Sequence, residues 1–510
     1  MSVLVFHGVV SAQAQRPTQS CQAAGPYITS AQAALATGDS TTALQGLRRA
    51  VETDPSCAEA YLLLGLTEFK AGAAADSIRH YKRALELQPA SYSAHYNLAL
   101  AYLREHRLQD GRMQLEQAVR LDPNQADAVY DLGVVLLDLG QPAEALPHLT
   151  SAQKLNPQRP DVAFNLVRAE LEAGHTAEAR SQAEAASKDF GTDFQWCAGV
   201  GQLFLKNSEP ADAAVYLGKA NQMRPDAVEI RHQLAEAYLA SGQLAQVLNV
   251  IPEAKTYQDH YLRGSALYLD HRFEDADQES QAAIALAPDD PQVLVLRVRL
   301  LQRAGEQNAA VELALKAASL ANNWYEPYYL AGVSLYFIRR YAEASQNLAR
   351  AAELNPRSSQ ALFLEAIALA SQGKQEEAEK WLRRAIAVQP NNARLYCHLG
   401  ILLGRENEPA QAEESLRKSI ELNPNNALSH YELGKLLVQS QRWKESAEEL
   451  QQAIHFDPGL SAAYYQLARV YARLGETEKS QSMLADFKKL YQAEKSDSQV
   501  QEDDARKETE

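Results

Sequence analysis

The sequence is poor in cysteine, glycine and proline, and it has no long apolar run. Only four of the 510 residues are cysteine, 24 are glycine and 20 are proline. Glycine and proline are therefore too scarce for a low-complexity polymer. A hydrophobic content of 46% excludes a chain that is disordered throughout. Since no run reaches the roughly 18 apolar residues that a membrane-spanning helix needs, we predict no transmembrane segment.

The chain also has no excess of positive charge. Fifty Lys and Arg residues face 65 Asp and Glu residues, which gives a formal net charge of −15. A surface of this sign repels phosphate backbones, and no local basic stripe compensates for it. We therefore predict no nucleic-acid partner.

Residue patterns that carry catalysis are missing as well. The sequence has no H-E-x-x-H, G-x-x-x-x-G-K-[ST], G-x-S-x-G or C-x-x-C motif. Its twelve histidines are scattered, and we expect His95, His260 and His430 to be half-buried packing residues and not ligands. These observations predict a protein that is not an enzyme and that uses no cofactor and no metal.

The N-terminal segment, residues 1–23, contains a candidate signal peptide. The apolar run "VLVFHGVV" is followed by Ala12 and Ala14, which form an A-x-A cleavage pattern. No Lys or Arg precedes this run, and His7 and Gly8 interrupt it. We expect export to a periplasmic or secreted location, with a frayed tail of a cytoplasmic protein as the alternative.

Prolines recur along the chain at a nearly constant spacing. Most of them are separated by 34 residues, and a period of this size indicates a repeat architecture. The positions are Pro55, Pro89, Pro123, Pro157, Pro225, Pro288, Pro356, Pro390, Pro424 and Pro458. If the proline is counted as position 32, position 8 is small, positions 20 and 27 are mostly alanine, and position 15 is often glycine.

This pattern predicts two short helices in each repeat. Glycine at position 15 can adopt the left-handed conformation that ends the first helix. Small residues at positions 8, 20 and 27 allow neighbouring helices to approach closely. The proline at position 32 cannot continue the second helix. One helical hairpin cannot cover its own apolar face, so the copies must stack on one another.

The segment from Ala58 to Pro89 resembles a tetratricopeptide repeat of the bacterial type, with its aromatic-x-x-Leu-Gly opening and its closing proline. Fourteen such copies occupy residues 24–494. The resemblance implies an all-α fold, a right-handed α-solenoid superhelix of stacked helix-turn-helix repeats. It also implies that positions 2, 5, 6, 9, 12 and 13 of the first helices face a concave groove.

Two parts of the array depart from the regular pattern. The copy at residues 228–256 is shortened, and Pro252 falls where its second helix should continue. This copy is either a joint between two arrays or a deletion that the stack absorbs. Residues 495–510 are polar and acidic, and we expect them to be a disordered tail.

Two cysteines flank the first repeat. Cys21 and Cys57 lie near its two chain ends, which antiparallel helices bring together. A disulfide between them is therefore possible if the protein is exported. We expect Cys197 and Cys397 to be small core residues.

Positions 5 and 6 supply the predicted binding residues of the groove. Position 5 is usually aromatic, and position 6 changes from polar in the early copies to leucine in the later ones. The aromatic set is Tyr96, Tyr130, Phe164, Tyr261, Tyr329 and Phe363; the polar set is Asn97, Asp131, Asn165 and Gln233; the leucine set is Leu262, Leu330 and Leu364. Amides can bond a peptide backbone, and tyrosine offers a large contact area with a polar tip.

We therefore predict a scaffold that binds protein or peptide partners in a groove whose later half is more apolar, with a role in an envelope or secretion assembly. The alternative for the groove is that the position-5 rings pack between repeats. The alternatives for the function are a substrate-recruiting subunit of a separate transferase and a cytoplasmic regulator. No Lys occurs at position 2 or 5, so the lysine clamp with which some members of this family hold a terminal carboxylate is not expected.

Overall fold

The structure is a computed structural model that describes the backbone of residues 21–507 and the side chains of residues 21–493. Within this range it contains twenty-eight α-helices and no β-strand, which confirms the all-α class. No helix in the described range combines the length and the apolarity that a membrane span requires. The candidate signal sequence up to Gln15 lies outside the described residues.

The chain divides between Pro252 and Glu253 into two compact units. The helices of the first unit are α1 Gly25–Ala36, α2 Ser40–Thr53, α3 Ala58–Lys70, α4 Ala74–Leu87, α5 Tyr92–Arg104, α6 Leu108–Leu121, α7 Ala126–Asp138, α8 Pro142–Leu155, α9 Pro160–Glu172, α10 Thr176–Phe190, α11 Phe194–Lys206, α12 Pro210–Met223, α13 Val228–Ala240 and α14 Leu244–Val250. The helices of the second unit are α15 Tyr257–Leu269, α16 Phe273–Leu286, α17 Pro291–Ala304, α18 Gln307–Leu320, α19 Tyr325–Phe337, α20 Tyr341–Leu354, α21 Ser359–Ser371, α22 Gln375–Val388, α23 Ala393–Arg405, α24 Pro409–Leu422, α25 Ala427–Gln439, α26 Trp443–Phe456, α27 Ser461–Leu474 and α28 Thr477–Lys507.

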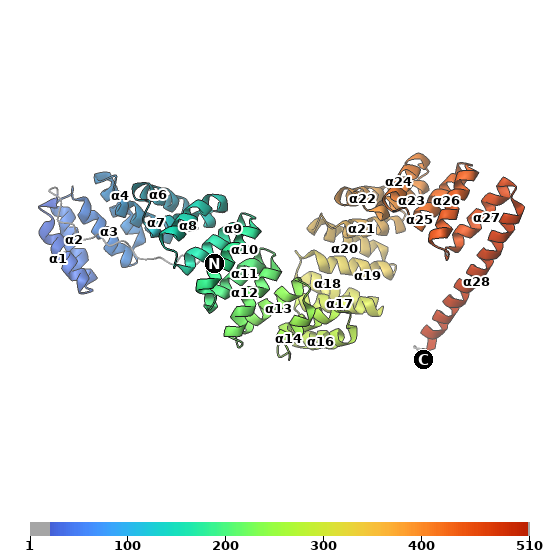
Figure 1. Ribbon diagram of the computed structural model, residues 1–510, viewed down its shortest axis with the longest axis horizontal. Coiled ribbons are helices and arrows are strands. Elements are labelled where there is room, and N and C mark those ends of the chain that lie inside the picture. The colour runs from blue at the N-terminus through green and yellow to red at the C-terminus, as the bar shows by residue number, and fades with distance from the viewer. Residues whose placement is uncertain (1–20, 508–510) are drawn as a thin grey trace. The chain divides into compact units, whose positions relative to one another are not determined.

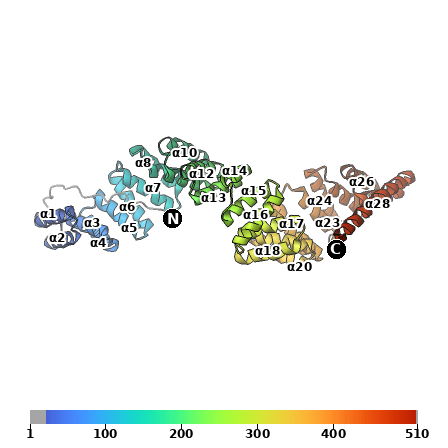
Figure 2. The same cartoon turned by 90° about the horizontal axis from the view of Figure 1, so that it is seen from below.

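These helices form hairpins that stack in chain order within each unit (Figure 1) (Figure 2). Each odd-numbered helix begins within one residue of a predicted repeat start. Among the described residues, the first helices of most consecutive repeats within a unit contact one another, as α19 and α21 do, whereas second helices do so far less. The first helices therefore form the inner, more closely packed face of each unit.

The turn inside every hairpin has the same backbone conformation. Position 15 has a positive φ in all fourteen copies, which ends the first helix in the left-handed region. Glycine occupies this position in eight copies, with φ of 73–87°, and the other six carry larger residues with φ of 58–63°. These six are His106, Ser208, His271, Arg339, Asn407 and Gln441.

Close packing within the hairpin depends on the small residue at position 8. A Cβ placed on Gly332 would lie 2.5 Å from Cγ of Leu348, which is position 24 of the same repeat. Gly400 is in the same relation to Leu416, at 2.6 Å. The alanines at position 20, such as Ala344, are fully buried. The two helices therefore touch at a distance that only small residues permit.

A disulfide joins the two ends of the first repeat. Cys21 and Cys57 are bonded in the structure, with their Cα atoms 5.0 Å apart, and both are buried. Cys57 also precedes α3, and its sulfur accepts a hydrogen bond from the backbone N–H of Ala60. Cys197 and Cys397 are buried thiols, as expected of small core residues.

The shortened repeat differs from the others in its second helix. Helix α14 has seven residues and ends at Val250, before Pro252, since proline cannot supply the next helical N–H. A capping box made by Thr256 and Asp259 then starts α15. The boundary between the two compact units coincides with this interruption.

The last helix extends further than composition suggested. Helix α28 runs from Thr477 to Lys507, so the backbone of residues 495–507 is helical where we expected a disordered tail. Glu, Lys, Gln and Ala are frequent in this stretch, and all four have high helix propensity. Nothing is described of residues 508–510.

Candidate functional site

The early part of the predicted groove is a buried hydrogen-bonded ladder between repeats. The hydroxyl of Tyr96 on α5 donates to Oδ2 of Asp131 on α7, at 2.8 Å. One repeat further, Nδ2 of Asn165 on α9 donates to the hydroxyl of Tyr130, at 2.9 Å. All four side chains are buried, so they join neighbouring repeats, as the alternative for position 5 expected.

Charged groups surround this ladder. Burial raises the pKa of Asp131 to about 7, although the hydrogen bond from Tyr96 opposes the shift. Arg159 stacks on the ring of Tyr130, with its guanidinium carbon 4.4 Å from the centroid. The same guanidinium pairs with Asp127 and with Asp161, at 2.7 and 2.6 Å.

The remaining polar and aromatic positions of the first unit also face neighbouring helices. Asn97 is buried. The ring of Phe164 packs on α11, where a Cβ on Gly199 would lie 2.9 Å from it. The amide oxygen of Gln233 accepts a hydrogen bond from Nε2 of Gln202, at 3.0 Å. Apart from Asn97, for which burial is the observation, the predicted residues of the first unit thus make contacts between repeats.

Three repeats have a histidine at position 4, and each of these histidines forms a hydrogen bond with a side chain of its own repeat. Nδ1 of His260 and of His430 each lies 2.6 Å from a carboxylate, that of Glu279 and of Glu449 respectively, and Nδ1 of His95 lies 2.8 Å from the amide oxygen of Gln114. Burial alone would lower the pKa of His430, but the bonds to Glu449 and to the Pro424 carbonyl raise it. No group of side chains in the described range could hold a metal ion.

In the second unit, the earlier predicted residues again pack between helices. Leu262 and Leu330 are buried, with 1% and 7% of their surfaces exposed. Tyr261 and Tyr329 are half-buried, and burial raises the pKa of both hydroxyl groups. None of these four side chains lines the pocket to which the last two predicted residues, Phe363 and Leu364, belong.

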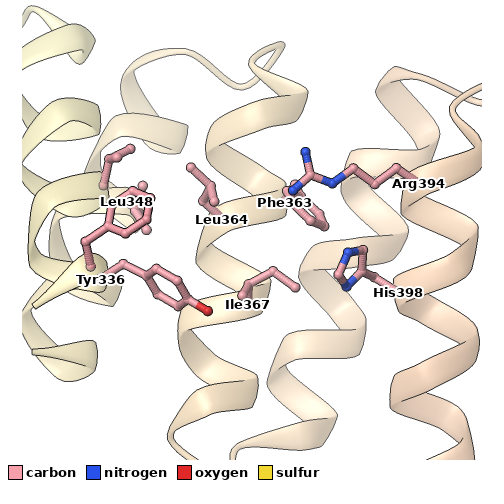
Figure 3. Close-up of a pocket in the computed structure, with 9 residues that line it drawn as sticks. Tyr336, Leu348, Phe363, Leu364, Ile367, Arg394 and His398 are labelled. Atoms are coloured by element: carbon pink, nitrogen blue, oxygen red, sulfur yellow. The ribbon is translucent and has the colours of Figure 1, made fainter. Parts of the chain in front are cut away.

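Phe363 and Leu364 line an apolar pocket on this face (Figure 3). The pocket has a volume of about 240 Å³. Three consecutive repeats build it, with first helices α19, α21 and α23 and one residue of α20. Its lining residues are Val333, Tyr336, Phe337, Leu348, Phe363, Leu364, Ile367, Arg394 and His398.

All of these residues except Leu348 occupy positions that the family resemblance places in the groove. Val333, Tyr336 and Phe337 are positions 9, 12 and 13 of their repeat. Arg394 and His398 are positions 2 and 6 of theirs. Positions 5 and 6 alone predict Phe363 and Leu364. The five residues at positions 2, 9, 12 and 13 lie outside that prediction, although the same family pattern could have pointed to them; they are Val333, Tyr336, Phe337, Ile367 and Arg394.

Aromatic and charged groups meet at one wall of the pocket, as Figure 3 shows. The rings of Phe363 and His398 make an edge-to-face contact with centroids 4.9 Å apart. The guanidinium carbon of Arg394 lies 4.7 Å from the centroid of Phe363. Burial, followed by the positive charges of Arg394 and Arg405, lowers the pKa of His398 to about 4. His398 is therefore neutral at physiological pH.

The similarity of this chain to known proteins lies in its repeats. Models described as tetratricopeptide repeat match at residues 28–92, 69–126, 96–161, 329–393 and 398–461, at 136–203 and 204–255, and at 462–492. The human protein O-mannosyl-transferase TMTC3 is 35% identical over 96 residues, which are 19% of this chain and 10% of TMTC3. The chain thus spans about a tenth of the length of that curated relative.

Three solved structures match the chain at low sequence identity. The APC/C hetero-tetramer Cut9–Hcn1 is 12% identical, with a TM-score of 0.41 and coverage of 88% of this chain and 97% of that one. Yeast Tom70 is 16% identical, with a TM-score of 0.33 and coverage of 85% and 92%. YrrB, a TPR protein with an unusual peptide-binding site, is 25% identical, with a TM-score of 0.33 and coverage of 36% and 96%.

One model alone matches more than half of the chain, at the same residues where the structure has its stacked helical hairpins. Such repeats serve protein–protein interaction. The chain belongs to the tetratricopeptide repeat family.

Proposed function

We propose that this chain is a non-catalytic scaffold that binds an extended segment of a partner protein along the first-helix face of its second unit. The observation that carries this proposal is the apolar pocket that α19, α21 and α23 build from inward-facing positions. A concave apolar site with a few polar groups is typical of a binding site. An extended segment could insert one side chain there and lie across the neighbouring repeats.

We further propose that the scaffold acts outside the cytoplasm, in an envelope or secretion assembly. The buried pair Cys21–Cys57 supports this setting, because disulfides persist in oxidising compartments. The candidate cleavage pattern at Ala12 and Ala14 is consistent with it. N-terminal sequencing of the protein expressed in a bacterial host is expected to show a start at Gln15, and an intact Met1 in the cytoplasmic fraction would contradict export.

Blocking the pocket tests the binding site. A library of random peptides displayed on phage is selected on the immobilised full chain, and the enriched peptides are measured against variants. Ile367→Trp fills the pocket from α21, and Val333→Phe fills it from α19. Both should abolish binding of the enriched peptides, while thermal unfolding verifies that the variants fold.

A matched control places the same large ring elsewhere in the unit. Leu286 on the second helix α16 is 59% exposed and does not line the pocket, so Leu286→Trp should leave binding unchanged. Peptides that bind equally to wild type and to both pocket-filled variants would reject this site.

A further inference from the structure

The edge of the pocket carries positive charge that no carboxylate of the described chain neutralises. Arg394 is the only basic residue at position 2 among the fourteen copies. Its side chain is exposed, and within the described residues neither Arg394 nor Arg405 forms an ion pair, although Arg340 and Arg417 in the same unit pair with Glu343 and Glu413.

The position of Arg394 connects this charge with the pocket. Its guanidinium lies over the face of Phe363, and Phe363 forms the pocket wall together with His398. In Figure 3 the Arg394 side chain extends from α23 toward Phe363 on α21, above His398. Since His398 is neutral at physiological pH, the positive charge at this wall comes from the arginine. A guanidinium offers several N–H donors suited to a carboxylate.

The cavity itself has the size and the walls for a ring. An apolar cavity of about 150 Å³ is large enough to hold benzene, and this one measures about 240 Å³. Tyr336, Phe337 and Phe363 supply aromatic walls, against which a guest ring can make edge-to-face contacts. Phe337 is 66% exposed, so an apolar shoulder remains open to solvent at the pocket.

We propose that the pocket recognises a partner segment in which an aromatic residue stands beside Asp or Glu. The ring enters the cavity, and the neighbouring carboxylate pairs with Arg394. This inference rests on the proposed function and specifies its ligand. Charge complementarity with Arg394 selects the acidic neighbour. This local attraction opposes the repulsion that the net charge of −15 of the whole chain exerts on an acidic segment.

Labelled Gly/Ser peptides test the proposal by fluorescence anisotropy with the full chain. One peptide has a central Phe between two Glu residues, and its relatives have Gln or Lys in place of Glu, or Ala in place of Phe. We expect the Glu peptide to bind about two- to fivefold more tightly than the Gln peptide, the range for a solvent-exposed ion pair. The Ala peptide should lose binding, and the advantage of Glu should shrink as salt is added.

Variants assign the charge effect to one residue. Arg394→Gln should remove the preference for Glu over Gln, and Arg394→Glu should transfer it to the Lys peptide. Arg384 is a matched control, because its guanidinium lies over Trp381 at 4.1 Å on the second helix α22, outside the pocket lining. Arg384→Gln should therefore leave all affinities unchanged.

The outcomes separate the two proposals. If Phe peptides bind and Ile367→Trp abolishes binding, but Glu and Gln peptides bind equally, the acidic preference is wrong and the pocket stands. If no Phe peptide binds, or if binding ignores Ile367→Trp, the pocket itself is rejected. A third arm uses free 3-phenylpropionate, and displacement of the peptide at equal concentration would show that a small aromatic acid, and not a protein segment, is recognised.

Discussion

The hydroxyl of Tyr96 donates a hydrogen bond to the carboxylate of Asp131, 2.8 Å away and 35 residues later in the chain. Both side chains are buried, with 0% and 5% of their surfaces exposed. The bond joins α5 to α7 and thus links two consecutive repeats. Because a buried acceptor that loses its donor is costly, the interface between these repeats depends on it.

Tyr96→Phe is therefore expected to destabilise the first unit. The loss should be about 1–3 kcal/mol, the range for leaving one buried polar partner unsatisfied. Urea unfolding monitored by circular dichroism measures it. Tyr27→Phe is the control, because Tyr27 is 37% exposed, and an equal loss in both variants would contradict a specific role for the Tyr96 hydroxyl.

Asp131 should make the stability of the first unit depend on pH. Burial raises its folded pKa to about 7, above the value of about 3.9 in an unfolded chain. Between about pH 4 and pH 7 the unfolded state releases this proton and the folded state keeps it, so stability falls as the pH rises, by up to about 1.4 kcal/mol per pH unit.

The variant Asp131→Asn keeps the shape of the side chain and removes its titration. The difference in unfolding free energy between wild type and variant should change in favour of wild type from pH 7.5 to pH 5. A difference that is constant over this range would show that Asp131 does not titrate in the folded state as described.

Two glycines of α23 should respond in opposite ways to alanine. A Cβ on Gly400 would meet Leu416 at 2.6 Å, whereas a Cβ on Gly404 meets nothing within 4 Å. Gly400→Ala should cost about 1–3 kcal/mol through overpacking, and Gly404→Ala should gain up to about 1 kcal/mol from helix propensity. Thermal unfolding of the two variants checks the signs, and a loss at Gly404 as large as at Gly400 would refute the packing explanation.

A glycine in place of Arg339 should make the turn between α19 and α20 more stable. Arg339 has φ of 62°, which a residue with a Cβ adopts at a conformational cost. Arg339→Gly is expected to stabilise the second unit by about 0.5–1 kcal/mol. Gly373→Ala makes the reverse change at a site with open space and should destabilise it by about 1 kcal/mol; calorimetry measures both, and equal signs would contradict the prediction.

The disulfide should stabilise the first repeat. The bond closes a loop with a sequence separation of 36, for which chain entropy predicts about 4 kcal/mol. Non-reducing peptide mass mapping should recover Cys21 and Cys57 as one cross-linked pair. Reductant should increase hydrogen exchange in α1 and α2 and leave α23 unaffected, and two free thiols in protein isolated under oxidising conditions would contradict the bond.

The repeat fold could be predicted because its determinants are local and recur. The prolines, the small residues at position 8 and the alanines at position 20 each act within one hairpin, so every copy repeats the same evidence. The left-handed turn was predicted from its eight glycines, but Arg339 and the five other non-glycine residues at position 15 show no such signal in their residue type.

The binding surface was harder to predict because burial depends on neighbouring repeats. Asn97 and Asp131 are polar and occupy groove positions, yet both are buried in the structure. The pocket arises where Tyr336, Ile367 and His398 from three repeats leave space between them. No single copy contains this information, since a cavity depends on the volumes of side chains far apart in the sequence.

The shared backbone conformation of position 15 has a practical consequence. In six of the fourteen copies this position already carries a side chain, and these side chains are as different as those of Arg339 and Asn407. The backbone conformation of the turn is therefore kept when the residue type changes. Single cysteines introduced there would carry spectroscopic labels at regular intervals along the array. Such a series of reporters could follow, hairpin by hairpin, the order in which the array melts.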